Sequence, residues 1–293
     1  MKTILITGAT GFLGSYLLHK LRANYRVIIL KRSFSDTWRI DDILQDITSY
    51  DIDYVELKHV FEKNNIDIII HTATSYGKKG ETISDMADAN FLFPLKLLEL
   101  SLSANTSLFI NTDTFFHQNI NFYALSKKQF LEWLKQCNKR ICVVNMKLEH
   151  MYGPGDNRSK FLVFLIKKML QDDPLDLTEG EQKRDFIFID DVANAYKKVL
   201  DRFSYEEPLF FEFEVGSGKS TSIRELVQLA YQLTESRSAL NFGVLPYREN
   251  EIMESEADIS ALVNIGWKPV MSLRDGMASM TDYEKKIAAV SDS

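Results

Sequence analysis

A tyrosine and a lysine four positions apart can do chemistry when they lie on a helix. Residues i and i+4 share one helix face, so the lysine ammonium can approach the phenol. A nearby ammonium favours the phenolate and lowers the pKa of the tyrosine towards neutral pH, which suits proton donation to a carbonyl oxygen. The spacing occurs three times, at Tyr16/Lys20, Tyr54/Lys58 and Tyr123/Lys127. The spacing alone does not select the catalytic pair, so the neighbouring sequence must.

Only Tyr123 follows a predicted strand whose end carries hydroxyl side chains. Residues 107–111 form an apolar run, and Thr112, Asp113 and Thr114 come directly after it. We therefore predict that Tyr123 donates the proton and that Lys127 assists it. Either Thr112 or Thr114 can bind the same oxygen, and we favour Thr112 for its place in the strand.

A glycine-rich turn separates the first predicted strand from the first predicted helix. Gly8, Gly11 and Gly14 have the spacing GxxGxxG. Glycines let the backbone approach a pyrophosphate, and the N-terminus of the following helix favours the anion. We predict a dinucleotide site here, which also includes the turn residues Thr10, Phe12 and Leu13.

The end of the second predicted strand bears on which dinucleotide binds. NAD-binding proteins usually carry an acidic residue there, which holds the ribose 2′-hydroxyl. This sequence has Lys31, Arg32 and Ser33 instead. Two cations and a hydroxyl suit a 2′-phosphate, so we predict NADP(H) rather than NAD. Asp51 and Ile52, further along the chain, are expected to flank the adenine.

Short apolar runs alternate with amphipathic stretches along the chain. Predicted strands cover residues 3–6, 26–30, 66–71, 107–111, 143–146 and 184–189, and predicted helices cover residues 14–21, 53–64, 83–103, 123–137, 161–170 and 223–234. Such alternation indicates βαβ units and a parallel sheet. We predict an α/β fold with a Rossmann-type doubly wound sheet over residues 1–150. A smaller C-terminal α/β domain follows over residues 151–293, of which residues 186–214 are expected to return to the first sheet.

The composition is that of an ordinary globular protein, with 293 residues, 45% of them hydrophobic and 26% charged. The 41 acidic and 35 basic residues give a formal net charge of −6, which argues against a nucleic-acid partner. Cys137 and Cys142 have no metal-ligand spacing and indicate a reducing compartment. No apolar run reaches the ~18 residues of a membrane span, and the N-terminus lacks a signal-peptide pattern. We expect a cytoplasmic protein without a metal or a membrane partner.

Taken together, the motifs resemble those of a known enzyme family. They are the glycine turn, the run from His71 to Thr74, the Thr/Tyr/Lys set and the run from Arg184 to Asp191. In this order they are similar to the extended short-chain dehydrogenases/reductases, the NAD(P)-dependent sugar-nucleotide epimerase/dehydratase family. The resemblance implies a Rossmann domain, a small substrate domain, a sugar-nucleotide substrate and a homodimer. It also implies further cofactor contacts at Thr72, Ala73, Thr74, Leu148 and His150.

The resemblance also implies residues on the substrate side. Arg184 and Arg248 hold the positions that bind the diphosphate in the family, and guanidinium groups suit paired phosphate oxygens. Lys160 is a weaker phosphate candidate. Asp113 and Thr114 are expected to line the sugar pocket. Glu149 and His150 stand where other members have a different motif, and either is placed to contact the sugar or the nicotinamide.

The residues at the strand end discriminate among the reactions of this family. Dehydratases carry Thr-Asp-Glu there, whereas this chain has Thr114 in place of the glutamate, which disfavours dehydration. Lys31 and Arg32 favour NADPH and therefore reduction of a ketone. Further motifs resemble those of the family's 4-ketoreductases for CDP-linked 4-keto-deoxyhexoses of O-antigen biosynthesis: residues 111–116, 147–150, 180–182 and 248–253. The alternatives are a 4-epimerase with bound NAD and a non-enzymatic dinucleotide-binding regulator.

One glycine-rich segment gives a false signal. Residues 215–221 resemble a P-loop, but Phe213 stands where the first glycine of that loop is required. We therefore reject a nucleoside-triphosphate site and predict that Ser222 caps the helix that follows.

Overall fold

The computed structural model describes residues 1–78, 80–202 and 209–291. The chain divides into two compact units. The first comprises Met1–Leu148 and Tyr196–Glu214, and the second comprises Glu149–Ala195 and Val215–Ser293. Within the described ranges, no helix combines the length and the apolar character that crossing a bilayer requires.

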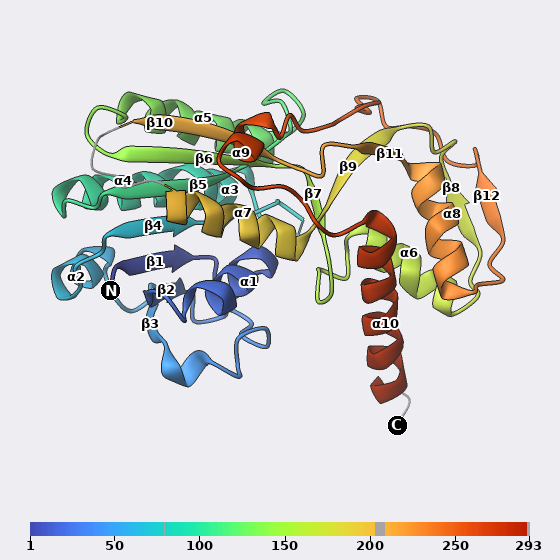
Figure 1. The fold of residues 1–293 in the computed structure, drawn as a ribbon, viewed down its shortest axis with the longest axis horizontal. Coiled ribbons are helices and arrows are strands. Elements are labelled where there is room, and N and C mark those ends of the chain that lie inside the picture. Colours follow the sequence, from blue (N-terminus) through green and yellow to red (C-terminus); the bar gives the residue numbers. More distant parts are fainter. Residues whose placement is uncertain (79, 203–208, 292–293) are drawn as a thin grey trace. The chain divides into compact units, whose positions relative to one another are not determined.

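A seven-stranded sheet forms the centre of the first unit (Figure 1). Its strand order is β10-β6-β5-β4-β1-β2-β3, and the five pairs of neighbouring strands among β1 to β6 are all parallel. The strands are β1 (Thr3–Thr7), β2 (Arg26–Lys31), β3 (Thr48–Asp51), β4 (Ile68–His71), β5 (Leu108–Thr114), β6 (Cys142–Leu148) and β10 (Phe210–Val215). The order reverses between β1 and β4, which is where open α/β sheets bind their ligands.

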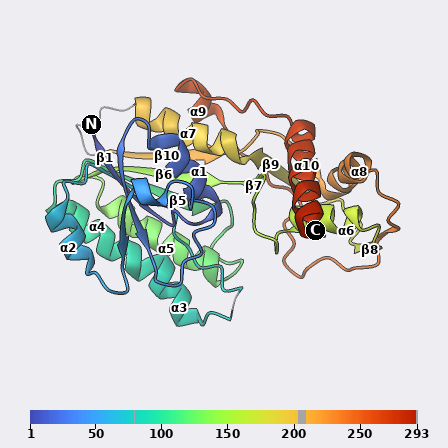
Figure 2. The same cartoon turned by 90° about the horizontal axis from the view of Figure 1, so that it is seen from below.

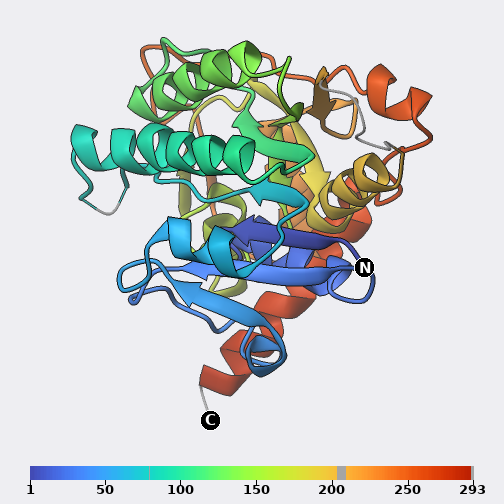
Figure 3. The ribbon, with the colours of Figure 1, turned by 90° about the vertical axis from the view of Figure 1, so that its left-hand side faces the viewer.

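Helices cover both faces of this sheet. They are α1 (Phe12–Leu21), η1 (Leu44–Asp46), α2 (Leu57–Lys63), α3 (Ile83–Ala87), η2 (Asp88–Leu92), α4 (Phe93–Ser103), α5 (Phe122–Gln136) and α7 (Ile189–Arg202), which runs from the second unit into the first. Figures 2 and 3 show α4 and α5 on one face and α7 on the other. One buried cluster joins Leu5, Ile69, Phe109 and Val143 of the strands to helix residues such as Phe130. Each such side chain contributes about 1.5–3 kcal/mol when fully buried.

The second unit contains two small sheets and a group of helices. Strand β9 (Lys183–Phe188) pairs in parallel with β7 (His150–Tyr152) and antiparallel with β11 (Ser220–Ser222). Strand β8 (Leu175–Leu177) pairs in parallel with β12 (Leu240–Phe242). The helices are α6 (Phe161–Leu170), α8 (Ile223–Thr234), α9 (Ser260–Asn264) and α10 (Leu273–Ser291). Helices α6, α8 and α10 contact one another.

The predicted α/β fold with a Rossmann-type parallel sheet is confirmed. The predicted cap is also confirmed, because Ser222 and Glu225 form a capping box at the start of α8. The helix expected over residues 83–103 is divided by a π-helical segment, η2, which places Asn90 in the interior. Strand β5 continues beyond the apolar run to Thr114, because its last residues still pair with β6.

Candidate active site

The glycine turn has the backbone conformation that a dinucleotide site requires. Gly8 has φ = 68°, and the Gly11 amide donates to the Gly8 carbonyl at 2.9 Å. A Cβ atom on Gly8 would lie 2.6 Å from the Ala73 nitrogen, and one on Gly14 would collide with the Gly8 carbonyl oxygen. Among the described residues, no side chain caps the N-terminus of α1 at Gly11. The N–H groups of the first helical turn therefore suit a pyrophosphate.

The two cations at the end of β2 pair with acidic residues at the end of β3. Lys31 Nζ lies 3.4 Å from Asp51 Oδ2, and the Arg32 guanidinium pairs with Asp53. The Ser33 amide and hydroxyl both donate to Asp53 Oδ2 at 2.8 Å, and these bonds lower the pKa of the Asp53 carboxyl. A 2′-phosphate bound here would share Arg32 and Ser33 with this carboxylate.

Arg32→Ala is expected to raise the KM for NADPH by about 10–10²-fold and to change the KM for NADH little. The reason is that a charge-assisted bond to a phosphate contributes about 1.5–3 kcal/mol, and NADH lacks the 2′-phosphate. Steady-state kinetics with both cofactors measures this. Arg22→Ala, at an exposed position after α1, is the control. An equal rise in KM for both cofactors would contradict an interaction between Arg32 and the 2′-phosphate.

Tyr123 lies in the first turn of α5, at the end of β5. Asn121 fixes the start of this helix, because its side chain accepts from the Ala124 amide at 2.8 Å. The Tyr123 hydroxyl hydrogen-bonds to the side chains of Thr114 and Tyr76. The rings of Tyr123 and Tyr76 lie 4.8 Å apart. Thr114 Oγ1 accepts from the Phe116 amide at 3.2 Å, so its own hydrogen is available to the Tyr123 oxygen.

The pKa of Tyr123 is raised well above its ordinary value, and burial is the largest cause. The neighbouring Tyr76 and the negative charge of Asp113 raise it further, whereas the hydrogen bond from Thr114 lowers it. The lysine was expected to bring this pKa down, but burial of the phenol dominates instead. Tyr123 is therefore protonated at neutral pH, which is the state that a proton donor needs.

Lys127 follows Tyr123 by one helical turn and is 2% exposed. Burial lowers the pKa of Lys127 to about 8, and the positive charge of Lys128 acts in the same direction. The carboxylate of Asp113 opposes both effects. A buried ammonium at this position is a strong donor for hydroxyl groups of a ligand.

The two threonines at the end of β5 have different partners. The hydroxyl of Thr112 lies 2.7 Å from that of Tyr196, which belongs to α7. The hydroxyl of Thr114, at the C-terminal end of β5, instead hydrogen-bonds to Tyr123 in the first turn of α5. This geometry favours Thr114, rather than the preferred Thr112, as the hydroxyl beside the proton donor.

Thr114→Val is expected to lower kcat by about 10²-fold, because a donor to the reacting oxygen is lost. Thr112→Val is expected to lower the melting temperature, since the buried Tyr196 hydroxyl loses its partner. Turnover and thermal unfolding of both variants separate the two roles. A large loss of turnover in Thr112→Val alone would restore Thr112 to the catalytic position.

Asp113 is enclosed by protein donors. Its side chain is 0% exposed and pairs with Lys128 Nζ at 2.7 Å. Asn145 Nδ2 and the Thr114 amide also donate to it. Asp113 therefore fixes Lys128 and the end of β5, and its carboxylate faces away from solvent.

Asn90 of η2 connects the segment after β4 to helix α5. Thr72 Oγ1 donates to the Thr7 carbonyl, and the Ala73 amide donates to Thr7 Oγ1. Thr74 Oγ1 donates to Asn90 Oδ1 at 3.0 Å, while Asn90 Nδ2 donates to Ser126 of α5 at 3.1 Å. The segment therefore lies beside both Gly8 and α5. Leu148, the last residue of β6, is buried, and its carbonyl accepts from the Phe115 amide.

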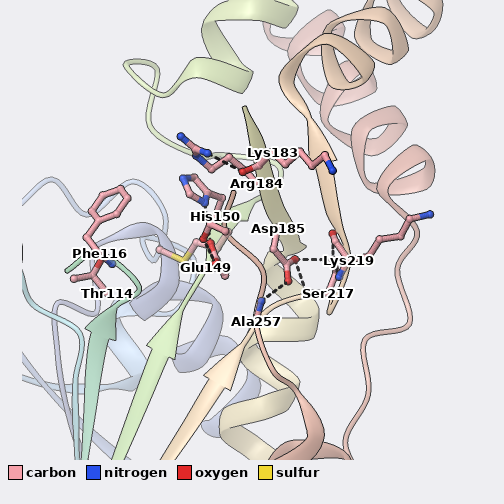
Figure 4. Close-up of polar contacts among 12 residues, drawn as sticks. Thr114, Phe116, Glu149, His150, Lys183, Arg184, Asp185, Ser217, Lys219 and Ala257 are labelled. Carbon is pink, nitrogen blue, oxygen red and sulfur yellow. Dashed lines mark hydrogen bonds and ion pairs between the residues drawn. The ribbon is translucent and has the colours of Figure 1, made fainter. Parts of the chain in front are cut away.

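In the second unit, Glu149 and His150 form a pair at the start of β7 (Figure 4). Glu149 Oε2 lies 3.0 Å from His150 Nδ1, and the side chain of Glu149 is 0% exposed. The Ser255 hydroxyl donates to the other carboxylate oxygen. The His150 ring lies 5.9 Å from that of Phe186 and remains one-third exposed. The carboxylate thus orients the imidazole and leaves part of it accessible.

The three residues that were predicted to bind the diphosphate lie in the second unit. Arg184 pairs with Glu251, and its charge also interacts with those of Glu149 and Arg248. Burial lowers the pKa of Arg184, although the guanidinium stays protonated. Arg248 is exposed. Lys160 Nζ lies 3.0 Å from Asp156.

Asp185 explains the glycine-rich segment that resembled a P-loop. It is fully buried and accepts from the Ser217, Gly218 and Ala257 amides and from the Ser217 hydroxyl (Figure 4). A Cβ on Gly216 would collide with this carboxylate. The glycines therefore allow the loop to wrap around an aspartate of its own chain.

The model of the NAD dependent epimerase/dehydratase family matches residues 4–210 of this sequence. The chain belongs to that family. Among curated members, CDP-abequose synthase of Salmonella muenchen is 37% identical over 97% of this chain and 98% of its own length. CDP-abequose synthase of Salmonella typhimurium is 35% identical over 94% of this chain and 96% of its own length.

Solved structures of the epimerase/dehydratase family share this fold. UDP-glucose 4-epimerase of Thermotoga maritima, with UDP-glucose, superposes with a TM-score of 0.85 at 21% identity and covers 98% of this chain and 99% of its own. UDP-glucuronic acid 4-epimerase of Bacillus cereus, with UDP-glucuronic acid and NAD, gives 0.83 at 24% identity over 97% and 99%. At these identities the likeness establishes the fold.

The residues present fit the nicotinamide dinucleotide on which the family depends. The turn at Gly8 and Gly14 leaves no room for a side chain, and the uncapped start of α1 presents donors. Three polar neighbours were not anticipated from the sequence: Asp53, Tyr76 and Lys128. None has a characteristic spacing, although Lys128 directly follows the predicted lysine.

Proposed function

We propose that this protein is an NADPH-dependent 4-ketoreductase of a CDP-linked 4-keto-deoxyhexose in O-antigen deoxysugar biosynthesis. Two relatives support the substrate class, since both are CDP-abequose synthases that match nearly the whole chain. Lys31, Arg32 and Ser33 support NADPH. The observation that carries the reaction type is the protonated phenol of Tyr123, hydrogen-bonded to Thr114 one turn before a buried lysine.

In this proposal, residues of the first unit protonate the ketone oxygen and donate a hydrogen bond to it. When bound, NADPH would supply the hydride that the carbonyl carbon accepts. Tyr123 donates its proton to the carbonyl oxygen, which becomes the new hydroxyl, while Thr114 donates a hydrogen bond to the same oxygen. Lys127 holds ribose hydroxyls, and its charge stabilises the phenolate that Tyr123 leaves behind.

The residues of the second unit supply contacts for the sugar nucleotide. Arg184 and Arg248 suit the two phosphate groups, with Lys160 as an additional cation. His150, oriented by Glu149, is proposed to contact the sugar. The free thiols of Cys137 and Cys142 support a cytoplasmic location. The homodimer remains a proposal, which light scattering tests.

A 4-epimerase with bound NAD is the second candidate, because the structural relatives include such enzymes. Epimerisation begins with oxidation of the C4 hydroxyl, whose proton Tyr123 would accept. The two CDP-abequose synthases that match nearly the whole chain favour the reductase instead. The two reactions also differ in stoichiometry, since only the reductase consumes one NADPH per product.

The deciding experiment is an NADPH-oxidation assay against 4-keto-6-deoxy and 4-keto-3,6-dideoxy sugars linked to CDP, dTDP or GDP, generated in situ by matching dehydratases. We expect oxidation with a CDP-linked substrate, and NMR of the product assigns the C4 configuration. Tightly bound NAD with interconversion of C4 epimers and no NADPH consumption would establish the epimerase. Dinucleotide binding without turnover of any sugar nucleotide would favour a regulator.

A further inference from the structure

A row of polar side chains crosses the sheet of the first unit. Thr7, His71, Asn111 and Asn145 occupy paired positions on β1, β4, β5 and β6. All four are at most 1% exposed. They stand two residues beyond Leu5, Ile69, Phe109 and Val143, so they form the next layer on the face that α5 covers.

Hydrogen bonds fix the orientation of the two amides in this row. Asn145 Nδ2 donates to Glu212 Oε2 at 2.8 Å and to Asp113 Oδ2 at 3.2 Å. Because carboxylates accept, Asn145 must present its NH₂ group to them. Its oxygen is then the acceptor for Asn111 Nδ2 at 2.8 Å. Asn111 Oδ1 therefore remains as an acceptor on the other side.

The opposite end of the row pairs His71 with Thr7. Thr7 Oγ1 accepts from the Ala73 amide at 3.2 Å and lies 2.8 Å from His71 Nδ1. Burial and the charge of Lys127 lower the pKa of His71 well below its ordinary value, so the imidazole is neutral. In the tautomer in which Thr7 donates its hydrogen to Nδ1, the imidazole proton is on Nε2, and we assign this tautomer as part of the proposal below. Nε2 is then a donor.

Two atoms in the middle of the row remain unmatched. Within the described part of the chain, His71 Nε2 and Asn111 Oδ1 are the buried side-chain atoms without a hydrogen-bond partner. One is a donor and the other an acceptor, and their residues are register partners on β4 and β5. A buried polar atom left unpaired is unfavourable, and a water molecule bonded to two or more such groups is the usual remedy.

We propose that one buried water molecule accepts from His71 Nε2, donates to Asn111 Oδ1 and accepts from the ammonium of Lys127, and that it thereby positions Lys127 towards the dinucleotide. The role of Lys127 in this inference rests on the proposed function, whereas the water site does not. The row then becomes one continuous chain of donors and acceptors from the Ala73 amide to Glu212. His71 and Asn111 are positioning residues that act through Lys127.

The charged groups around Lys127 and the proposed water together set the pKa of Lys127. Asp113 favours the ammonium, Lys128 opposes it, and neutral His71 and Tyr123 add no charge. A bound water that accepts from the ammonium also favours the charged form. Loss of the water should therefore lower the pKa of Lys127.

The first test is a high-resolution crystal structure of the protein with NADPH. We expect a density peak within hydrogen-bonding distance of His71 Nε2, Asn111 Oδ1 and Lys127 Nζ. In Asn111→Leu the peak should be absent. A wild-type structure without this peak, or with the two side chains bonded directly to each other, would overturn the water site whatever the enzyme's reaction is.

The second test is the pH dependence of NADPH binding, measured by nicotinamide fluorescence. Binding to the wild type should weaken as Lys127 loses its proton. Asn111→Leu and His71→Leu should move this transition down towards pH 8, the value that Lys127 has without the water, and His71→Gln, which keeps a donor, should restore it. Ile110→Ala, a buried change in β5 on the other face, controls for lost stability. An unshifted transition in both leucine variants would overturn the positioning role, while failure of the ketoreductase assay alone would leave it intact.

Discussion

Tyr123→Phe is expected to lower kcat by about 10²–10⁴-fold while NADPH affinity stays nearly unchanged. The variant keeps the ring that packs against Tyr76 at 4.8 Å and removes only the group that donates the proton. General acid catalysis contributes rate factors of this size, equivalent to about 3–5 kcal/mol of barrier. Steady-state oxidation of NADPH with the 4-keto sugar nucleotide measures the loss, and fluorescence titration measures the affinity.

The sequence offers a matched control in another Tyr-x-x-x-Lys pair. Tyr54 has the same spacing to Lys58, but its side chain is 83% exposed and Lys58 pairs with Glu62. Tyr54→Phe should therefore retain wild-type turnover. If Tyr123→Phe also reduced the ketone at the wild-type rate, the proton would have to come from another group, and the assignment of Tyr123 would be wrong.

The fold was predictable because each signal for it is local. Short apolar runs, the glycine turn and the helical periodicities identify most elements of the first unit. The choice of Tyr123 among three candidates was also a local inference, from hydroxyl residues at the preceding strand end. The short strands β8 and β12 were not predicted, since three residues carry little periodicity.

The features of the site that the sequence could not predict depend on contacts between segments that are distant in the chain. Only the path of α7 shows that Thr112 meets Tyr196 and leaves Thr114 for Tyr123. The spacing of Tyr123 and Lys127 predicts a shared helix face, but the pKa of each depends on how deeply α5 is buried. The polar row also requires the strand register, because its four residues are spread over 139 positions of the sequence, from Thr7 to Asn145.

Lys127→Met is expected to make the ligand-free protein more stable and the enzyme much less active. Burial lowers the pKa of Lys127 from 10.5 to about 8, which corresponds to about 3 kcal/mol of destabilisation by the charged form. Methionine fills similar space without a charge, so urea unfolding at pH 7 should show a gain in unfolding free energy of up to about 3 kcal/mol. Turnover should fall by about 10²-fold or more, because the ribose contact and the charge beside Tyr123 are lost.

The stability gain of Lys127→Met depends on pH, because the folded and unfolded chains bind different numbers of protons above pH 8. Below pH 8 the lysine is charged in both the folded and the unfolded chain, so the full penalty is present. Between pH 8 and 10.5 the unfolded chain binds more protons, so the stability of the wild type rises with pH and the advantage of Lys127→Met shrinks. Unfolding curves at pH 7 and pH 9.5 measure the difference.

The neighbouring lysine supplies the control of opposite sign. Lys128 pairs with the buried Asp113 carboxylate at 2.7 Å and donates to the Thr114 carbonyl at 2.7 Å. Lys128→Met leaves that carboxylate uncompensated and should destabilise the protein by about 3–5 kcal/mol. Adjacent lysines on one helix are thus expected to have opposite effects, because Lys128 is paired with Asp113 whereas burial disfavours the ammonium of Lys127. Equal destabilisation by both substitutions would show that the protein itself compensates the charge of Lys127.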